Sequence, residues 1–200
     1  MSDWTLIGST ALLIVHMQNA ITRSPSPLDF MGHPRATAED EVIPHIAALL
    51  AAFREKGLPV FYVVAYTPDD YPAPVYGLFW RGIEESRANR LGTQDVEIVD
   101  ELKPREDEPV LYNWPFDLFR TTDLEERFDA AGIETVVLVG VSTGMAINVA
   151  AYQLAERFYN LIIPSDCITD GNRGLHDVLV AGVLPVLGLV TTHDDVIAHL

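Results

Sequence analysis

The chain has little cysteine and little positive charge. Its one cysteine, Cys167, can form neither an internal disulfide nor a cluster of thiolate ligands. Lys and Arg number 13 against 29 Asp and Glu, which gives a net charge of −16. Such a surface is unsuited to nucleic-acid backbones and to anionic membranes, so we predict neither partner. We expect the charge to favour solubility, and Cys167 to be a buried structural thiol rather than a nucleophile.

Long apolar runs are also missing. None approaches the roughly 18 residues that a membrane-spanning helix needs. The first ten residues, MSDWTLIGST, lack the basic segment followed by an apolar one that marks a secretory signal. We therefore predict a cytoplasmic protein. The length of 200 residues, with 48% hydrophobic residues, predicts a single globular domain over residues 1–200.

Short apolar runs alternate with segments of helical periodicity. The predicted strands cover Thr10–His16, Pro59–Ala65, Pro109–Asn113, Thr135–Gly140, Asn160–Pro164 and Gly188–Thr191. The predicted helices cover Glu39–Lys56, Asp123–Ala131, Gly144–Arg157, Leu175–Val186 and Asp194–His199. This alternation, with short connections, predicts an α/β fold: a Rossmann-like three-layer α/β/α sandwich with a mostly parallel six-stranded sheet.

Local signals refine these boundaries. Gly57 and Gly132 are placed to end two of the helices, and the pattern Thr122–Glu125 is typical of a capping box. Residues 68–107 are less regular and carry Tyr71, Tyr76, Phe79 and Trp80. Aromatic side chains at this density favour an ordered cover over a disordered loop.

Four segments resemble one known family. They are ALLIVHMQNAI (residues 11–21), LGTQDVEIVDELKPREDEPVLYN (91–113), LVGVSTGMAINVAAYQLAERFYNLIIPSDCITD (138–170) and the C-terminal TTHDDVIAHL. In this order they resemble the isochorismatase-like (cysteine hydrolase) superfamily, which includes nicotinamidases, N-carbamoylsarcosine amidases and isochorismatases. The resemblance covers nearly the whole chain. It implies the isochorismatase-like hydrolase fold and a homo-oligomer.

The same resemblance shows what the chain has replaced. The amidases of the family use an Asp after the first strand, a Lys after the third, and a Cys at the start of the helix after the fourth. The matching positions here hold His16, Asn113 and Ala146. Isochorismatase-type members lack the Cys but keep the Asp, which is also missing here. The superfamily's chemistry therefore does not carry over to this degenerate triad.

No metal or cofactor is predicted. The amidase metal pattern, Asp-x-His after the second strand, has no match in TPDDYPAPVYG. The remaining histidines, His33, His45, His176, His193 and His199, show no metal-ligand spacing.

We predict catalytic roles for His16, Asn113 and Ser142. An unperturbed imidazole titrates near pH 6.5, so His16 is a candidate acid or base. Asn113 is suited either to holding a ligand carbonyl and orienting His16 or to a structural role, because an amide cannot carry a proton. Ser142 lies in the turn after the fourth strand, where the family often has a cis peptide. Ala146 offers no nucleophilic atom, which excludes thiol catalysis there.

The predicted substrate-binding residues are Gln18, Trp80, Trp114, Thr143 and Ala146. The aromatic members, with Phe79 and Tyr76, suit the flat wall of a pocket for a planar ligand. Thr143 is equally suited to capping a helix, and Gln18 to hydrogen bonds with the backbone. Arg81 and Arg87 are candidate partners of a ligand carboxylate.

Two functions fit these residues. One is an enzyme that acts on a small, cyclic or carbonyl-bearing molecule by acid–base chemistry without a cysteine nucleophile. The alternative is a catalytically inactive member that binds a small molecule or a partner protein. The sequence does not decide between them and does not identify the substrate.

Overall fold

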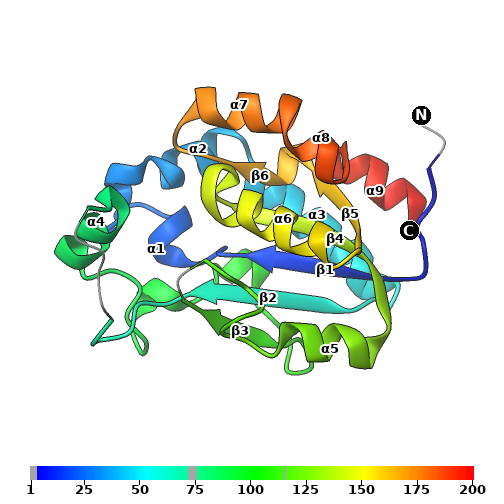
Figure 1. The fold of residues 1–200 in the computed structure, drawn as a ribbon, viewed down its shortest axis with the longest axis horizontal. Coiled ribbons are helices and arrows are strands. Elements are labelled where there is room, and N and C mark those ends of the chain that lie inside the picture. Colours follow the sequence, from blue (N-terminus) through cyan, green and yellow to red (C-terminus); the bar gives the residue numbers. More distant parts are fainter. Residues whose placement is uncertain (1–3, 72–75, 115) are drawn as a thin grey trace.

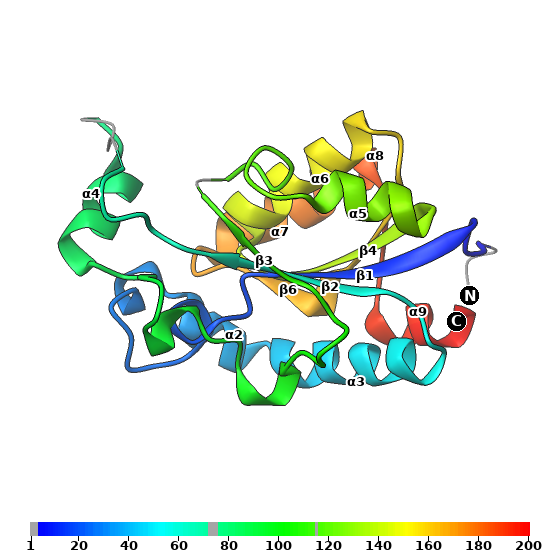
Figure 2. The ribbon, with the colours of Figure 1, turned by 90° about the horizontal axis from the view of Figure 1, so that it is seen from below.

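Three layers build the fold in a computed structural model of the protein, which describes residues 4–71, 76–114 and 116–200. A sheet forms the middle layer, with helices on both of its faces (Figure 2). One face is covered by α5 (Leu124–Ala131), α6 (Asn148–Glu156), α7 (Arg173–Gly182) and α8 (Leu184–Leu187). The other face is covered by α2 (His33–Glu39), α3 (Val42–Glu55) and α9 (His193–His199). The predicted three-layer architecture is confirmed.

The sheet is parallel throughout its described pairings, in the order β3-β2-β1-β4-β5-β7 (Figure 1). These strands are β1 (Ser9–Val15), β2 (Val60–Ala65), β3 (Val110–Asn113), β4 (Ile133–Val141), β5 (Asn160–Pro164) and β7 (Leu189–Thr191). All six predicted strands are present, with ends that differ by two residues at most. The short strand β6 (Ile168–Thr169) also pairs with β4, and two residues are too few to show a periodic pattern.

Burial explains why the central strands are continuously apolar. Along β1, Leu12 and Ile14 belong to the core cluster on the α3 side, whereas Ala11, Leu13 and Val15 belong to the cluster on the α6 side. Each of these five side chains is at most 1% exposed. A strand buried on both faces leaves no room for the polar residues that an exposed face would carry. Each large apolar side chain buried in this way contributes about 1.5–3 kcal/mol.

Several helices differ from their predicted extents. The segment predicted as one helix from Glu39 is two helices, because Glu41 adopts a left-handed conformation (φ 52°) between α2 and α3. The predicted helix Leu175–Val186 is likewise divided into α7 and α8 near Pro185, which has no N–H to donate. The capping box does not form, since the Thr122 hydroxyl accepts from Leu124 N and no side chain caps α5.

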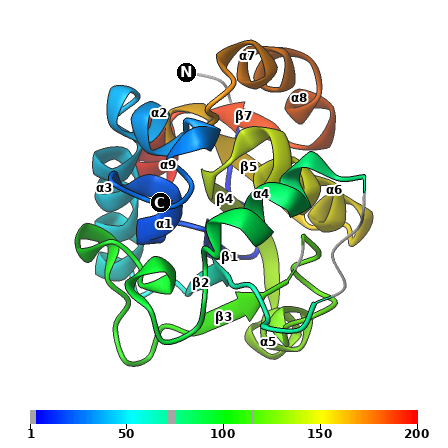
Figure 3. The ribbon, with the colours of Figure 1, turned by 90° about the vertical axis from the view of Figure 1, so that its left-hand side faces the viewer.

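The carboxyl ends of the strands lie at one edge of the sheet. Helices α1 (Asn19–Thr22) and α4 (Leu78–Ser86) lie over this edge (Figure 3). The irregular cover also contains two short 3₁₀ turns, Gln94–Val96 and Asp100–Leu102. Within the described residues, no helix is both long enough and apolar enough to cross a bilayer.

Candidate ligand site

His16 and Asn113 meet at the carboxyl edge of the sheet. Each is next to the end of its strand, and β2 lies between β1 and β3, which brings the two strand ends to the same edge. His16 Nε2 lies 3.0 Å from Asn113 Oδ1, and both side chains are buried. The backbone of His16 has a positive φ of 57° and donates its N–H to Val63 O at 2.8 Å. The fold therefore holds this imidazole in one place against the amide.

Burial changes the acid–base character of His16. It lowers the pKa of the imidazole from 6.5 to about 4, although the hydrogen bond that His16 donates to Asn113 Oδ1 acts in the opposite direction. The ring is therefore neutral at physiological pH, not half-protonated as an exposed histidine would be near pH 6.5. The sequence predicted the pKa of an exposed histidine for His16, because the depth of its burial is a property of the folded chain.

Asn113 contacts His16 but does not line the neighbouring cavity. Its side chain is 0% exposed, and its Nδ2 has no hydrogen-bond partner among the described residues. One end of the amide thus holds the imidazole, while the other is a buried donor without a partner. Such a group costs about 1–3 kcal/mol, so the arrangement is maintained by the surrounding structure.

A small cavity opens in front of His16. Its volume is about 50 Å³, which is room for a few water molecules or a small organic group. None of the described lining residues is Lys, Arg, Asp or Glu. The described lining residues are His16, Ile21, Leu28, Met31, His33, Ala65, Phe79, Ile83, Asn89, Trp114, Phe116, Val141, Ser142, Met145 and Ala146.

Three predicted site residues share this cavity with His16. They are Trp114, Ser142 and Ala146. Ala146 is 4% exposed and presents a methyl group where the family resemblance places a thiol. Ser142 follows a cis peptide bond from Val141, at the place where the resemblance suggests one.

Gln18, Trp80 and Thr143 do not line the cavity. Gln18 bridges the backbone of Ala65, donating to its O at 2.9 Å and accepting from its N at 2.8 Å. Trp80 packs against Trp114, with ring centroids 4.9 Å apart. The Thr143 hydroxyl lies 2.9 Å from His176 Nδ1. A direct contact between any of these three and a substrate remains a prediction.

The aromatic wall differs from the predicted one. Phe79 and Phe116 line the cavity beside Trp114, whereas Tyr76 is 96% exposed and contributes nothing to it. Arg81 and Arg87 do not line it either. Among the described residues, the cavity therefore has an apolar wall and no guanidinium to pair with a ligand carboxylate.

His33 and Asn89 are polar lining residues that sequence reasoning missed. His33 Nδ1 accepts a hydrogen bond from Gly171 N at 3.0 Å, and burial lowers its pKa against the opposing charge of Asp170. Asn89 Oδ1 accepts from Gln18 Nε2 at 3.0 Å. Both belong to segments that fold over the sheet edge from elsewhere in the chain, and no local pattern in the sequence indicates this.

Comparisons with a family model and with related sequences indicate one family, and solved structures agree with it in fold. A family model of the isochorismatase domain matches residues 10–195. The isochorismatase family protein YecD of Escherichia coli is 27% identical over 202 residues, covering 96% of each chain. The secreted isochorismatase effector Isc1 of Verticillium dahliae is 29% identical over 159 residues, covering 76% of each. An isochorismatase family protein from Desulfovibrio vulgaris has a similar fold, with a TM-score of 0.80 at 24% identity over 95% of this chain and 98% of that one.

Proposed function

This chain belongs to the isochorismatase family, and within that family we propose that it binds a small uncharged molecule in the cavity beside His16. The observation that carries the proposal is the neutral His16–Asn113 pair at the side of an apolar cavity. Binding without turnover is the function that this geometry supports best.

The chemistry of the lining defines the ligand class. Aromatic and aliphatic side chains favour an apolar body, whether a short chain or the edge of a ring. His16 uses Nε2 for Asn113, which leaves Nδ1 for a hydroxyl or amide of the ligand. The Ser142 hydroxyl offers a second polar contact in the same cavity. A carboxylate ligand would lose its hydration without gaining a cationic partner, so we expect it to be rejected.

The same groups argue against amidase chemistry. Ala146 cannot form a covalent intermediate. His16 is a poor general acid near neutral pH, because its pKa of about 4 leaves almost no protonated imidazole. A group with that pKa is also a weak base. The pocket thus keeps hydrogen-bonding capacity while the groups that drive the family's reactions are replaced.

Acid–base turnover is a second candidate, favoured by one observation. The Ser142 hydroxyl and the His16 ring line the same cavity, so a nucleophile and a base lie near one ligand. If turnover depends on neutral His16, its rate should rise as the pH increases through about 4 and stay level above that, because His16 is then fully deprotonated. A profile with its midpoint near pH 6.5 would contradict this role.

Matched neutral and anionic probes test the binding proposal. Tryptophan fluorescence and calorimetry should show saturable binding of acetamide or benzamide and none of acetate or benzoate. Two pairs are used because the cavity of about 50 Å³ should distinguish a small ligand from one that carries a ring. The same four compounds, assayed for consumption by NMR, test for turnover.

Filling the cavity provides the variant and its control. Ala146→Leu places extra carbons where the ligand would lie, and we expect it to abolish binding. Ala130→Leu makes the same change on the exposed surface of α5 and should leave binding intact. Equal binding by both variants, or tighter binding of the carboxylates, would overturn the proposal.

We also propose that the chain forms a homo-oligomer. Val178 of α7 and Val186 of α8 are 65% and 82% exposed, and they lie on neighbouring helices. Burying such side chains against a second copy would remove apolar surface from water. Sedimentation equilibrium of the wild type and of Val186→Glu tests this: a monomeric wild type would contradict it.

A further inference from the structure

Three residues from distant parts of the chain converge beside the turn that follows β5. They are His45 of α3, Asp166 of the 3₁₀ turn Ser165–Cys167, and His193 at the start of α9. One possible ligand atom from each lies within 4.8 Å of the other two, and all three residues are half-buried. None of them lines the cavity beside His16. We propose that His45, Asp166 and His193 form a binding site for one divalent transition-metal ion, with Zn²⁺ as the natural probe.

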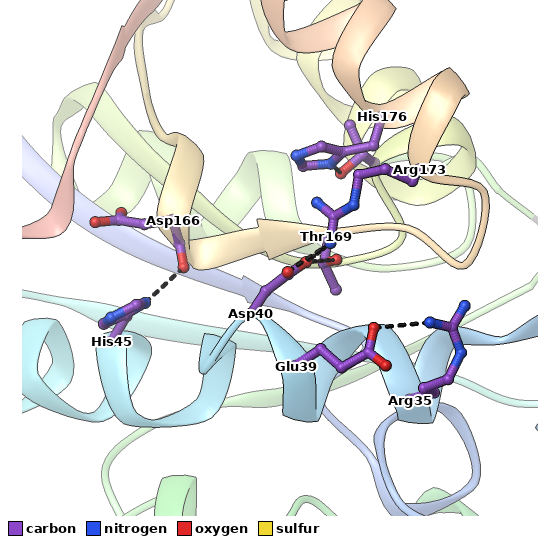
Figure 4. Close-up of polar contacts among 9 residues, drawn as sticks. Arg35, Glu39, Asp40, His45, Asp166, Thr169, Arg173 and His176 are labelled. Carbon is purple, nitrogen blue, oxygen red and sulfur yellow. Dashed lines mark hydrogen bonds and ion pairs between the residues drawn. The ribbon is translucent and has the colours of Figure 1, made fainter.

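Asp166 organises both imidazoles. His45 Nδ1 lies 2.9 Å from the Asp166 backbone oxygen, a contact visible in Figure 4. His193 Nδ1 lies 2.7 Å from Asp166 Oδ2, and the His193 backbone N–H donates to Oδ1 at 2.9 Å. A carbonyl and a carboxylate oxygen only accept, so Nδ1 is the donor in each neutral ring and Nε2 keeps its lone pair. The His45 contact with the Asp166 backbone oxygen can persist while Nε2 binds an ion, as is typical of metal-binding histidines. The His193 contact cannot, because the carboxylate that accepts from its Nδ1 is also the proposed third ligand, so this hydrogen bond is exchanged for bonds to the ion.

The two rings are also aligned with each other. Their centroids are 4.5 Å apart and their planes differ by 26°. Bond lengths of about 2.0–2.2 Å to Zn²⁺ require ligand atoms roughly 3.3 Å apart. The present spread of up to 4.8 Å therefore has to contract by rotation of the imidazoles about their side-chain bonds. Such torsions have broad energy minima, so the rings can turn, and the bonds to the ion replace the hydrogen bond between His193 and Asp166.

The donor types select the class of ion. Two imidazoles and one carboxylate suit first-row divalent ions such as Zn²⁺, Co²⁺ and Ni²⁺, whereas Mg²⁺ prefers oxygen ligands alone. Nearby Asp40 is not available as a further ligand, because it is bound by Arg173 and Thr169 (Figure 4). Water fills the remaining positions of the ion. Bound metal would fasten α9 to α3 and to the turn after β5.

Zinc titration of the untagged, full-length protein tests the site. Calorimetry should show one Zn²⁺ bound per chain, with a higher melting temperature in Zn²⁺ than in Mg²⁺. Co²⁺ should give visible absorption bands that Zn²⁺ then displaces.

Conservative variants keep the fold while removing ligands. His45→Asn retains a donor at the position of Nδ1, and His193→Asn does the same toward Asp166. Each should weaken Zn²⁺ binding by roughly tenfold or more. His199→Asn, on the same helix but outside the cluster, is the matched control and should bind as the wild type does. Cys167→Ser should also bind normally, since its thiol is buried.

Two results would overturn the proposal. One is the absence of saturable Zn²⁺ binding by the folded wild type. The other is undiminished affinity in the double variant His45→Asn/His193→Asn, or loss of binding in Cys167→Ser, which would assign the ion to other residues. Circular dichroism of every variant confirms that the fold is retained before binding is compared.

Discussion

Neutral groups occupy the positions at which the family resemblance places charged and nucleophilic groups. The family resemblance places an acid and an amine where His16 and Asn113 form a buried hydrogen bond of 3.0 Å. A neutral pair of this kind avoids the cost of burying two charges. Ala146 removes the nucleophile without leaving a polar atom. At the scale of single residues, the site has a buried hydrogen bond but no charged or nucleophilic side chain at these three positions.

The buried His16 should make stability depend on pH. Its pKa is 6.5 in the unfolded chain and about 4 in the folded one, so between these values the unfolded state binds more protons. The resulting stability, about 3 kcal/mol, is complete above pH 6.5 and is lost as the pH falls toward 4. About 1 kcal/mol should be lost between pH 7.5 and pH 5.5.

Urea unfolding of the wild type and of His16→Asn at several pH values measures this loss in the free energy of unfolding. Asparagine tolerates the positive φ at this position and does not titrate, so the variant should lack this part of the pH dependence. The comparison cancels the contributions of the carboxylates, which both proteins share. If the free energy of unfolding changed with pH equally in the two proteins, His16 would not be buried as a neutral ring.

Cys167 should be inert in the folded protein. Its side chain is 0% exposed, and burial, together with the charge of Asp166, raises the pKa of the thiol. The reactive thiolate is therefore scarce and inaccessible. Thiol-modifying reagents should label the protein only after urea unfolding, as counted by mass spectrometry. Rapid labelling of the native chain would contradict the structural role predicted from the sequence.

At the scale of elements, one close contact between strands fixes the site. Gly140 on β4 has φ +127°, and a Cβ there would lie 2.0 Å from Val15 O on β1. Only glycine lets the two strands run this close immediately before His16 and Ser142. The positions of these two site residues therefore depend on a backbone contact and not only on side-chain packing.

Gly140→Ala should be strongly destabilising. We expect a loss of at least about 3 kcal/mol in the free energy of unfolding, because the clash is with backbone and the φ is unfavourable. Gly57→Ala is the matched control: it also has a positive φ, +65°, but nothing within 4 Å of the added Cβ. That variant should lose only about 1–2 kcal/mol. If denaturant titrations gave the two variants similar losses in the free energy of unfolding, the close β1–β4 contact would not be the cause of the destabilisation.

At the scale of the whole molecule, charge is the dominant surface property. The net charge of −16 on 200 residues makes the folded chain repel itself. It also predicts weak non-specific binding to nucleic acids, which are anionic too. The cavity differs from this acidic surface, because none of its described lining residues is Asp, Glu, Lys or Arg. An uncharged ligand therefore suits the cavity better than a cation attracted by the net charge would.

Added salt should therefore stabilise the protein. The Debye length falls from about 30 Å at 0.01 M to about 8 Å at 0.15 M ionic strength, which screens the repulsion between carboxylates. We expect the melting temperature to rise by a few degrees over this range. Choline chloride should act like sodium chloride, because the effect is one of screening. A melting temperature that does not change with salt would mean that the surface charges are already paired.

The sequence by itself determined the fold, because apolar runs buried on both faces and helix-ending glycines are local signals that survive in a list of residues. The resemblance to the family also predicts a replaced triad at His16, Asn113 and Ala146, and this stays a prediction. The sequence could not supply the pKa of His16, the places of His33 and Asn89 in the cavity, or the approach of His45 to His193. Only the tertiary structure decided these, because burial and contacts between distant segments depend on how the layers close over the sheet.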